Sequence, residues 1–147
     1  YERGAARPLF QGAASRIILA YLPSAQVRKI FESDEAAVRQ AGLGENLNAL
    51  RAHLRAMRQA GFDKTESQVT RGVTGVAAPI FDRRNNVLGS LSLTLGEDHL
   101  APERLSQVAV RVMTCASIVT RAIARHTSDP LGESPQIMLA RGGTSAG

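Results

Sequence analysis

Two neighbouring stretches near the middle of the chain are β-prone: residues 73–82 are mostly apolar, and in residues 87–95 apolar positions alternate with Ser and Thr from Leu91 on. The polar sequence Arg-Arg-Asn-Asn separates them. Two β-prone stretches around an Asn-rich turn predict a β-hairpin. If Asp82 pairs with Val87, the loop has about four residues, which is a common hairpin length. The remaining predicted elements are arranged around this hairpin.

The two faces of the hairpin differ in chemistry, because neighbours along a strand point to opposite sides of the sheet. One face is apolar and consists of Val76, Ala78, Ile80, Gly89, Leu91 and Leu93. The other face mixes small and hydroxyl-bearing residues and consists of Gly75, Ala77, Pro79, Phe81, Leu88, Ser90, Ser92 and Thr94. The first is predicted to face a core. The second fits either the lining of a cavity or a half-exposed surface, and spacing alone does not separate these two interpretations.

Small residues open the first predicted helix. Residues 11–15 read Gln-Gly-Ala-Ala-Ser and lead into apolar residues 17–22, and Pro23 ends the helix. Such a start leaves backbone N–H groups open to a ligand, and the helix dipole favours an anion there. A tight entry chosen only for packing is the alternative, and the pattern by itself favours that alternative.

Helical spacing predicts three further helices, over residues 24–31, 33–44 and 47–59, with Ser24 and Asn46 suited to be N-caps. The helix over 47–59 has an apolar stripe formed by Leu47, Leu50, Leu54 and Met57. A basic stripe on another face consists of Arg51, Arg55 and Arg58. This stripe contacts DNA or an acidic partner, or it simply faces solvent, which is the more common case. Gly61 is placed as a left-handed C-cap.

The C-terminal half is predicted to add a strand, loops and one long helix. Residues 62–69 lack helical spacing and are interpreted as a strand followed by a loop. Pro102 suits the first turn of a helix that runs to about His126. Its buried side would carry Leu105, Val108, Val112, Ala116, Val119 and Ile123. Residues 127–147 are rich in Pro, Gly and Ser and are predicted to be a tail without its own core.

The chain has 147 residues, of which 44% are hydrophobic, and this suffices for one domain with a core. Its single cysteine excludes an internal disulfide and fits a reducing compartment, so we expect a cytoplasmic protein. The sequence shows no apolar run that we judge long enough to cross a bilayer. A net charge of +5 weakly favours anionic partners, and 4% aromatic residues argue against base-stacking surfaces.

Residue types that catalyse reactions or bind metals are scattered. His53, His99 and His126 have no second ligand at metal spacing, which argues against a zinc site. Cys115 falls on the apolar side of the long helix, where we expect a buried and inert thiol. The pattern Gly-x-Ser-x-Gly at residues 143–147 lacks the strand and helix of a nucleophile elbow. Spacing therefore predicts no enzyme, no cofactor and no metal site.

An ordered set of motifs resembles a known family. Residues 8–22 read Pro-Leu-Phe-Gln-Gly-Ala-Ala-Ser-Arg and then, after one residue, Ile-Leu-Ala-Tyr-Leu. Gly-Phe at 61–62, Gly-Val at 72–73, Val-Ala-Ala-Pro-Ile-Phe-Asp at 76–82 and Leu-Ser-Leu at 91–93 follow in order. Over roughly residues 8–126 this set resembles the C-terminal, effector-binding domain of IclR-type transcription regulators.

The resemblance implies an α/β (α+β) fold: a GAF-like curved antiparallel sheet flanked by helices, with a long C-terminal helix. The domain would span residues 1–126, lacking its N-terminal part, and the tail would span 127–147. In this family backbone N–H groups at the small-residue helix start hold the carboxylate of a small organic acid, which implies Ala13 and Ala14 here. The other implied ligand-binding positions are Thr65, Val73, Gly75, Ser92 and Thr94.

Several positions depart from the family pattern. Thr65 stands where an acidic residue can bind the ligand, Gly75 replaces a larger polar residue, and Gln68 replaces a common glutamate. Arg16 stands where many members carry lysine. The loss of acidic residues removes negative charge from the pocket and enlarges it. This predicts an effector that is larger or more anionic than glyoxylate or pyruvate. A segment before Tyr1 would supply part of the apolar pocket wall, and the family's winged helix-turn-helix is not in this sequence.

We therefore expect a ligand-sensing and oligomerising domain of a bacterial transcription regulator. Its partners would be a small carboxylate or aromatic acid, further copies of itself in a dimer or tetramer, and DNA only through a separate domain. No membrane is expected to take part. One alternative is a dimerisation module with a vestigial pocket. Another is an enzyme on a GAF-like scaffold, for which Asp63, Glu66 and Asp82 are the nearby ionisable candidates.

Overall fold

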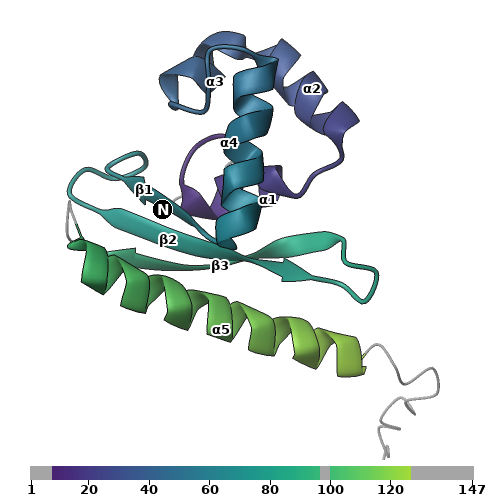
Figure 1. Cartoon of the computed structure of the whole chain (residues 1–147), viewed down its shortest axis with the longest axis vertical. Helices are drawn as coiled ribbons and strands as arrows, with labels where there is room; N and C mark the ends of the chain where they lie inside the picture. The colour runs from purple at the N-terminus through teal and green to yellow at the C-terminus, as the bar shows by residue number, and fades with distance from the viewer. Residues whose placement is uncertain (1–7, 97–99, 127–147) are drawn as a thin grey trace, which may run out of the picture.

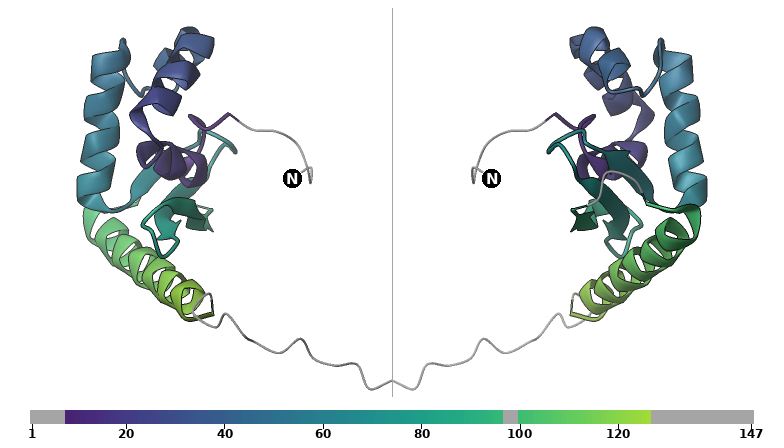
Figure 2. Two further views of the ribbon diagram at one scale, coloured as in Figure 1. Left: turned by 90° about the vertical axis from the view of Figure 1, so that its right-hand side faces the viewer. Right: turned by 90° about the vertical axis from the view of Figure 1, so that its left-hand side faces the viewer.

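The computed structural model describes residues 8–96 and 100–126, which form a three-stranded antiparallel sheet and five helices. The elements are α1 (Ala13–Ala20), α2 (Ser24–Ser33), α3 (Glu35–Gln40), α4 (Leu47–Ala60), β1 (Asp63–Glu66), β2 (Thr74–Phe81), β3 (Val87–Leu95) and α5 (Pro102–His126). The strands follow one another in the order β1-β2-β3. Figures 1 and 2 show α5 along one face of the sheet and the other helices on the opposite side. The predicted mixed α and antiparallel β class is confirmed.

The register of the hairpin follows the alternation pattern along most of its length. Gly75 pairs with Thr94, and every pair up to the residue before Phe81 keeps the register that the predicted hairpin implied. The end of the hairpin differs: Phe81, and not Asp82, pairs with Val87, because a β-bulge lies beside Phe81. The predicted pairing of Asp82 with Val87 is therefore wrong by one residue.

Asp82 organises the turn and does not extend the strand. Its Oδ1 accepts hydrogen bonds from the backbone N–H groups of Arg84, at 2.7 Å, and Asn86, at 2.8 Å. Its Oδ2 accepts from the Asn86 side chain at 3.0 Å, and Asn85 takes the left-handed conformation with φ of 61°. The hydrogen bonds from Asn86 lower the pKa of Asp82, because they stabilise the ionised carboxylate. These hydrogen bonds stabilise the turn, and the β-bulge beside Phe81 lies where the turn joins β2.

The two faces of the hairpin sort as predicted. Val76 and Ala78 are buried against α5, together with Leu100, Ala109, Val112 and Ala116. The opposite face lies toward α1, where the Ser90 hydroxyl donates to the backbone carbonyl of Ala14 at 2.9 Å. Leu93 belongs to the α5 face but remains exposed, as expected for an outer strand of the described sheet. The small, hydroxyl-bearing face therefore adjoins a helix start.

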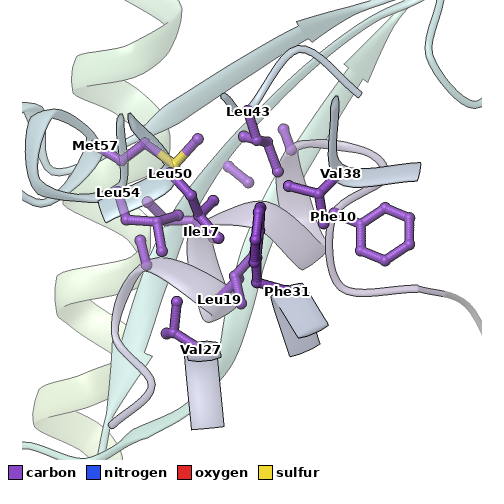
Figure 3. Packing of buried hydrophobic residues seen from close by; sticks show 13 residues of the cluster. Phe10, Ile17, Leu19, Val27, Phe31, Val38, Leu43, Leu50, Leu54 and Met57 are labelled. Atoms are coloured by element: carbon purple, nitrogen blue, oxygen red, sulfur yellow. The ribbon is translucent and has the colours of Figure 1, made fainter. Parts of the chain in front are cut away.

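A second core joins the helices on the α1 side of the sheet. Figure 3 shows apolar side chains from α1, α2, α3 and α4 pointing toward one another. The largest that are fully buried are Ile17, Leu19, Val38, Leu43, Leu50 and Leu54. The predicted stripe of α4 supplies Leu50, Leu54 and Met57 to this core, with Leu47 half-buried at its edge.

Helix ends follow the predicted caps in two cases and differ in a third. The Asn46 side chain accepts from the N–H three residues later at 2.9 Å, and Gly61 ends α4 with φ of 76°. Ser24, however, is the first residue of α2, and Pro23 occupies the N-cap position. Pro23 is favourable there because its fixed φ suits a helix entry and it has no N–H to satisfy.

The long helix α5 has the predicted bounds but not the predicted environment for its thiol. Its buried residues are Ala109, Val112 and Ala116, whereas Cys115 is exposed, so the prediction of a buried thiol is wrong. By length and composition α5 would also suffice to cross a membrane, which our reading of the sequence missed. Its apolar stripe nevertheless contacts β2 and β3. The predicted tail, with its Gly-x-Ser-x-Gly pattern, and His99 lie outside the described residues.

Candidate functional site

The start of α1 fits tightly against the sheet because its residues are small. Gly12 is the N-cap with φ of 78°, and a Cβ at this position would lie 2.8 Å from Cγ2 of Val69. A Cβ on Gly75 would lie 3.7 Å from the Ala13 Cβ. Glycine and alanine at these points therefore let the first turn of α1 approach β2 and the loop before it.

Two of the first backbone donors of this helix already have partners. The N–H of Ala13 donates to Oγ1 of Thr65 at 3.1 Å, and the N–H of Gly12 donates to Oε1 of Gln68 at 3.3 Å. Within the described residues the N–H of Ala14 has no acceptor. The expectation of open donors therefore holds for Ala14, while the N–H of Ala13 is open only when Thr65 turns away.

A cavity of about 110 Å³ lies between the start of α1, the hairpin and the loop from β1 to β2. All seven positions named from the resemblance line it: Ala13, Ala14, Thr65, Val73, Gly75, Ser92 and Thr94. They come from α1, β1, β2, β3 and the residue before β2. Ser92 and Thr94 are exposed, so the cavity opens to solvent along β3. The structure thus brings together residues that are up to 81 positions apart in the sequence (94 − 13).

The loop between β1 and β2 covers part of this cavity and was not predicted to do so. Gln68 lies between two elements, because its Oε1 accepts from Gly12 and its Nε2 donates to the carbonyl of Ala41 at 3.3 Å. Val69 and Thr70 also line the cavity, as do Gln11 and Ser15. A loop position has no periodicity, so only the departure of Gln68 from the family pattern marked this segment in the sequence.

The cavity is electrically neutral at its surface, since none of its lining residues is ionisable. Charge compensation for a bound anion would come from the helix dipole, the Ala14 N–H and hydroxyl groups. The three ionisable residues considered as catalytic candidates do not line the cavity. Asp63 pairs with Arg16, the Glu66 carboxylate pairs with Lys64 at 2.7 Å, and Asp82 forms the hairpin turn. The described residues also hold no cluster of metal-ligating side chains.

A buried ion pair fixes α1 one turn beyond the cavity. Nε of Arg16 lies 2.9 Å from Oδ2 of Asp63, both residues are buried, and a second Arg16 nitrogen lies 3.2 Å from Nε2 of His53. Burial raises the pKa of Asp63 to about 6 and outweighs the opposite effect of the Arg16 charge. Burial, and then the Arg16 charge, lowers the pKa of His53. Asp63 and Thr65, two residues apart on β1, therefore both hold α1.

Comparison with known proteins gives one consistent result. Residues 2–121 match the family model described as "Bacterial transcriptional regulator IclR C-terminal". The chain is 25% identical over 127 residues to the HTH-type transcriptional regulator KdgR of Escherichia coli, covering 86% of this chain and 48% of that protein. It is 29% identical over 122 residues to the glycerol operon regulatory protein of Streptomyces griseus, covering 82% and 47%. The chain spans about half the length of the curated relatives it matches.

Solved structures share the fold. The C-terminal domain of KdgR from Escherichia coli matches with a TM-score of 0.67 and 23% identity, covering 82% of this chain and 73% of that one. The Agrobacterium tumefaciens repressor BlcR matches with a TM-score of 0.69 and 18% identity, covering 84% and 50%. These relatives are transcriptional regulators rather than enzymes.

Proposed function

Because this chain belongs to the family of C-terminal domains of bacterial IclR transcriptional regulators, we propose that it senses a small organic acid and assembles as a homodimer or homotetramer. Residues 1–126 form the sensing domain in this proposal, and 127–147 form a tail. Acid binding shifts the placement of subunits and so alters DNA binding by a separate winged helix-turn-helix domain in the cytoplasm. Such a switch requires that the acid bind two arrangements with different affinity.

The observation that carries this proposal is the convergence of seven residues on one cavity at the start of α1. In the proposed complex one carboxylate oxygen accepts from the N–H of Ala14, at the positive end of the helix dipole. The Thr65 hydroxyl donates its proton to the same carboxylate, while its oxygen still accepts from Ala13. Ser92 and Thr94 hold the other end of the ligand.

The size and charge of the cavity define the ligand class. About 110 Å³ is below the roughly 300–1,000 Å³ of sites for drug-sized ligands, so a small carboxylate fits best. This argues against the larger effector expected from the sequence, except where an aromatic acid extends through the opening beside β3. The neutral lining favours a single carboxylate over a more highly charged anion, because no cationic side chain compensates a second charge.

Two glycines of the hairpin provide a matched test. Gly75→Val places a branched side chain between Thr65 and Ala13 and fills the cavity, whereas Gly89→Val points into open space on the other face. Calorimetry and thermal shift with a panel of carboxylates should detect binding to the wild type and to Gly89→Val, and none to Gly75→Val. If no carboxylate binds the wild type, or if both variants bind equally well, the proposal is wrong.

One observation favours a dimerisation module with a vestigial pocket as the second candidate. Thr65 and Gln68 already accept from two helix donors, so the protein satisfies those groups without a ligand. Intact oligomers in analytical ultracentrifugation, combined with a melting temperature that no carboxylate changes, would favour this alternative.

A further inference from the structure

A second recess lies at the opposite end of α1 from the candidate site. It has a volume of about 390 Å³ and is bounded by the end of α1, the start of α2 and one side of α4. The polar side chains of its lining belong to Tyr21, Ser24, Arg51, Arg55 and Arg58. No acidic residue lines it. The basic stripe predicted on α4 therefore does not lie on a flat helix surface, because its three arginines border a concavity.

Neighbouring groups hold the three arginine side chains to different extents. Nη1 of Arg58 donates to the carbonyl of Ala20 at 2.6 Å and so caps the end of α1. Nη2 of Arg51 donates to the Ser24 hydroxyl at 3.2 Å, while its Nε is buried without an acceptor. Arg55 makes no side-chain hydrogen bond or ion pair within the described part of the chain. Arg58 is therefore held in place, and the other two have donors to offer.

None of these three arginines has a carboxylate partner among the described residues, in contrast to Arg16 and Arg39. Like charges one helical turn apart repel each other, so the arrangement costs free energy in the unliganded protein. An anion in the recess would remove this repulsion. Guanidinium groups bind phosphate oxygens in pairs of parallel hydrogen bonds, which makes arginine well suited to a phosphate group.

We propose that this recess binds a small phosphate ester. Arg51 and Arg55 donate to the phosphate oxygens, the Ser24 hydroxyl donates a further hydrogen bond, and Tyr21 flanks the organic part of the ligand. The volume falls in the range of small-molecule sites and exceeds the space that inorganic phosphate needs. The recess is concave and is bordered by three helices, which favours a small ester over the backbone of a DNA duplex.

Calorimetry on the full chain at 150 mM salt, roughly the physiological ionic strength, tests this proposal with glucose 6-phosphate, glucose and a short DNA duplex. Arg55→Gln removes a charge without breaking a described contact, and Arg111→Gln removes one from the exposed side of α5 as a matched control. We expect saturable binding of glucose 6-phosphate only, at least about tenfold weaker in Arg55→Gln and within about twofold of wild type in Arg111→Gln.

Three results would overturn the proposal: no saturable binding of the ester by the wild type, equal weakening in both variants, or Arg55-dependent binding of the duplex without binding of the ester. Thr94→Val serves as a further control, because Thr94 is exposed on β3 and lines the carboxylate cavity but not the recess. Binding of the ester should persist in Thr94→Val, and its loss there would also contradict a separate site.

Discussion

The sheet contacts its two helical layers through different chemistry. On the α5 side the buried contacts are apolar and centre on Val76 and Ala78. On the α1 side polar atoms meet: the Thr65 hydroxyl accepts from α1, the Ser90 hydroxyl donates to it, and Arg16 pairs with Asp63 on β1. Both contacts of the sheet are buried, but only the contact with α1 depends on the geometry of individual hydrogen bonds.

We infer that the apolar contact with α5 mainly provides stability, whereas the polar contact with α1 responds to ligand binding. Apolar burial stabilises in proportion to area and tolerates small shifts, whereas a buried polar contact is lost when its geometry changes. A ligand that competes for Thr65 or for the first N–H groups of α1 therefore acts on the polar layer. The apolar layer keeps α5 on the sheet while this happens.

The largest effect is expected for Asp63→Ala, which leaves the Arg16 guanidinium buried without a partner. Removing one member of a buried ion pair lowers the free energy of unfolding by about 3–5 kcal/mol. Urea unfolding followed by circular dichroism measures this. Combining the change with Arg16→Met should restore much of the loss, and a loss below about 1 kcal/mol in the single variant would show that the pair does not hold α1.

On the apolar side, Val76→Ala should lower the free energy of unfolding by about 2 kcal/mol, since the side chain is fully buried against α5. Carboxylate affinity should stay unchanged, because the residue faces away from the cavity. The same urea experiment and calorimetry measure both quantities. A large loss of affinity would mean that the two layers are coupled more tightly than their contacts indicate.

Acid titration distinguishes the layers in another way. The pKa of Asp63 rises from 3.8 to about 6 on folding. The folded state keeps this proton between those values while the unfolded chain releases it, so stability from this group falls as pH rises from about 4 to about 6. His53 acts in the opposite direction, because its pKa is lowered on folding. The difference in the free energy of unfolding between wild type and Asp63→Asn across this interval isolates the contribution of the carboxyl group. The difference between wild type and Val76→Ala should not change with pH, because this variant keeps Asp63.

The smallest effects are expected at the open side of the cavity. Ser92→Ala and Thr94→Val should each weaken carboxylate binding by about 1–2 kcal/mol through loss of one hydrogen bond, with stability nearly unchanged since both residues are exposed. Ser106→Ala on α5 is a control that removes a hydroxyl distant from the cavity. Unchanged affinity in both hairpin variants would remove these two residues from the site.

The sequence predicted what depends on periodicity and failed where tertiary contacts decide. Alternation placed Gly75, Ser92 and Thr94 on one face of the hairpin, because a strand has only two faces. The bulge beside Phe81 was missed, since it depends on the hydrogen bonds that Asp82 makes in the turn. Cys115 was misplaced because helical spacing does not fix how deeply a helix face is buried.

The candidate site shows the same division. Residues on α1 and the hairpin were anticipated from pattern and resemblance together. Val69 and Thr70 were not, because a loop that closes over a cavity has no signature in local sequence, and Gln68 was marked only by its departure from the family pattern. The Arg16–Asp63 pair was also missed, since its partners are 47 positions apart (63 − 16) and the motif that contains Arg16 does not indicate which residue it pairs with.

The most direct test of the account is nitrogen-15 NMR of the full chain during titration with the carboxylate that binds best in calorimetry. We predict saturable shifts of the amide signals of Ala13 and Ala14, together with Thr65 and Thr94, and their absence in Gly75→Val. Saturable binding that shifts only signals of α2 and α4, and leaves the Ala14 amide unchanged, would contradict it.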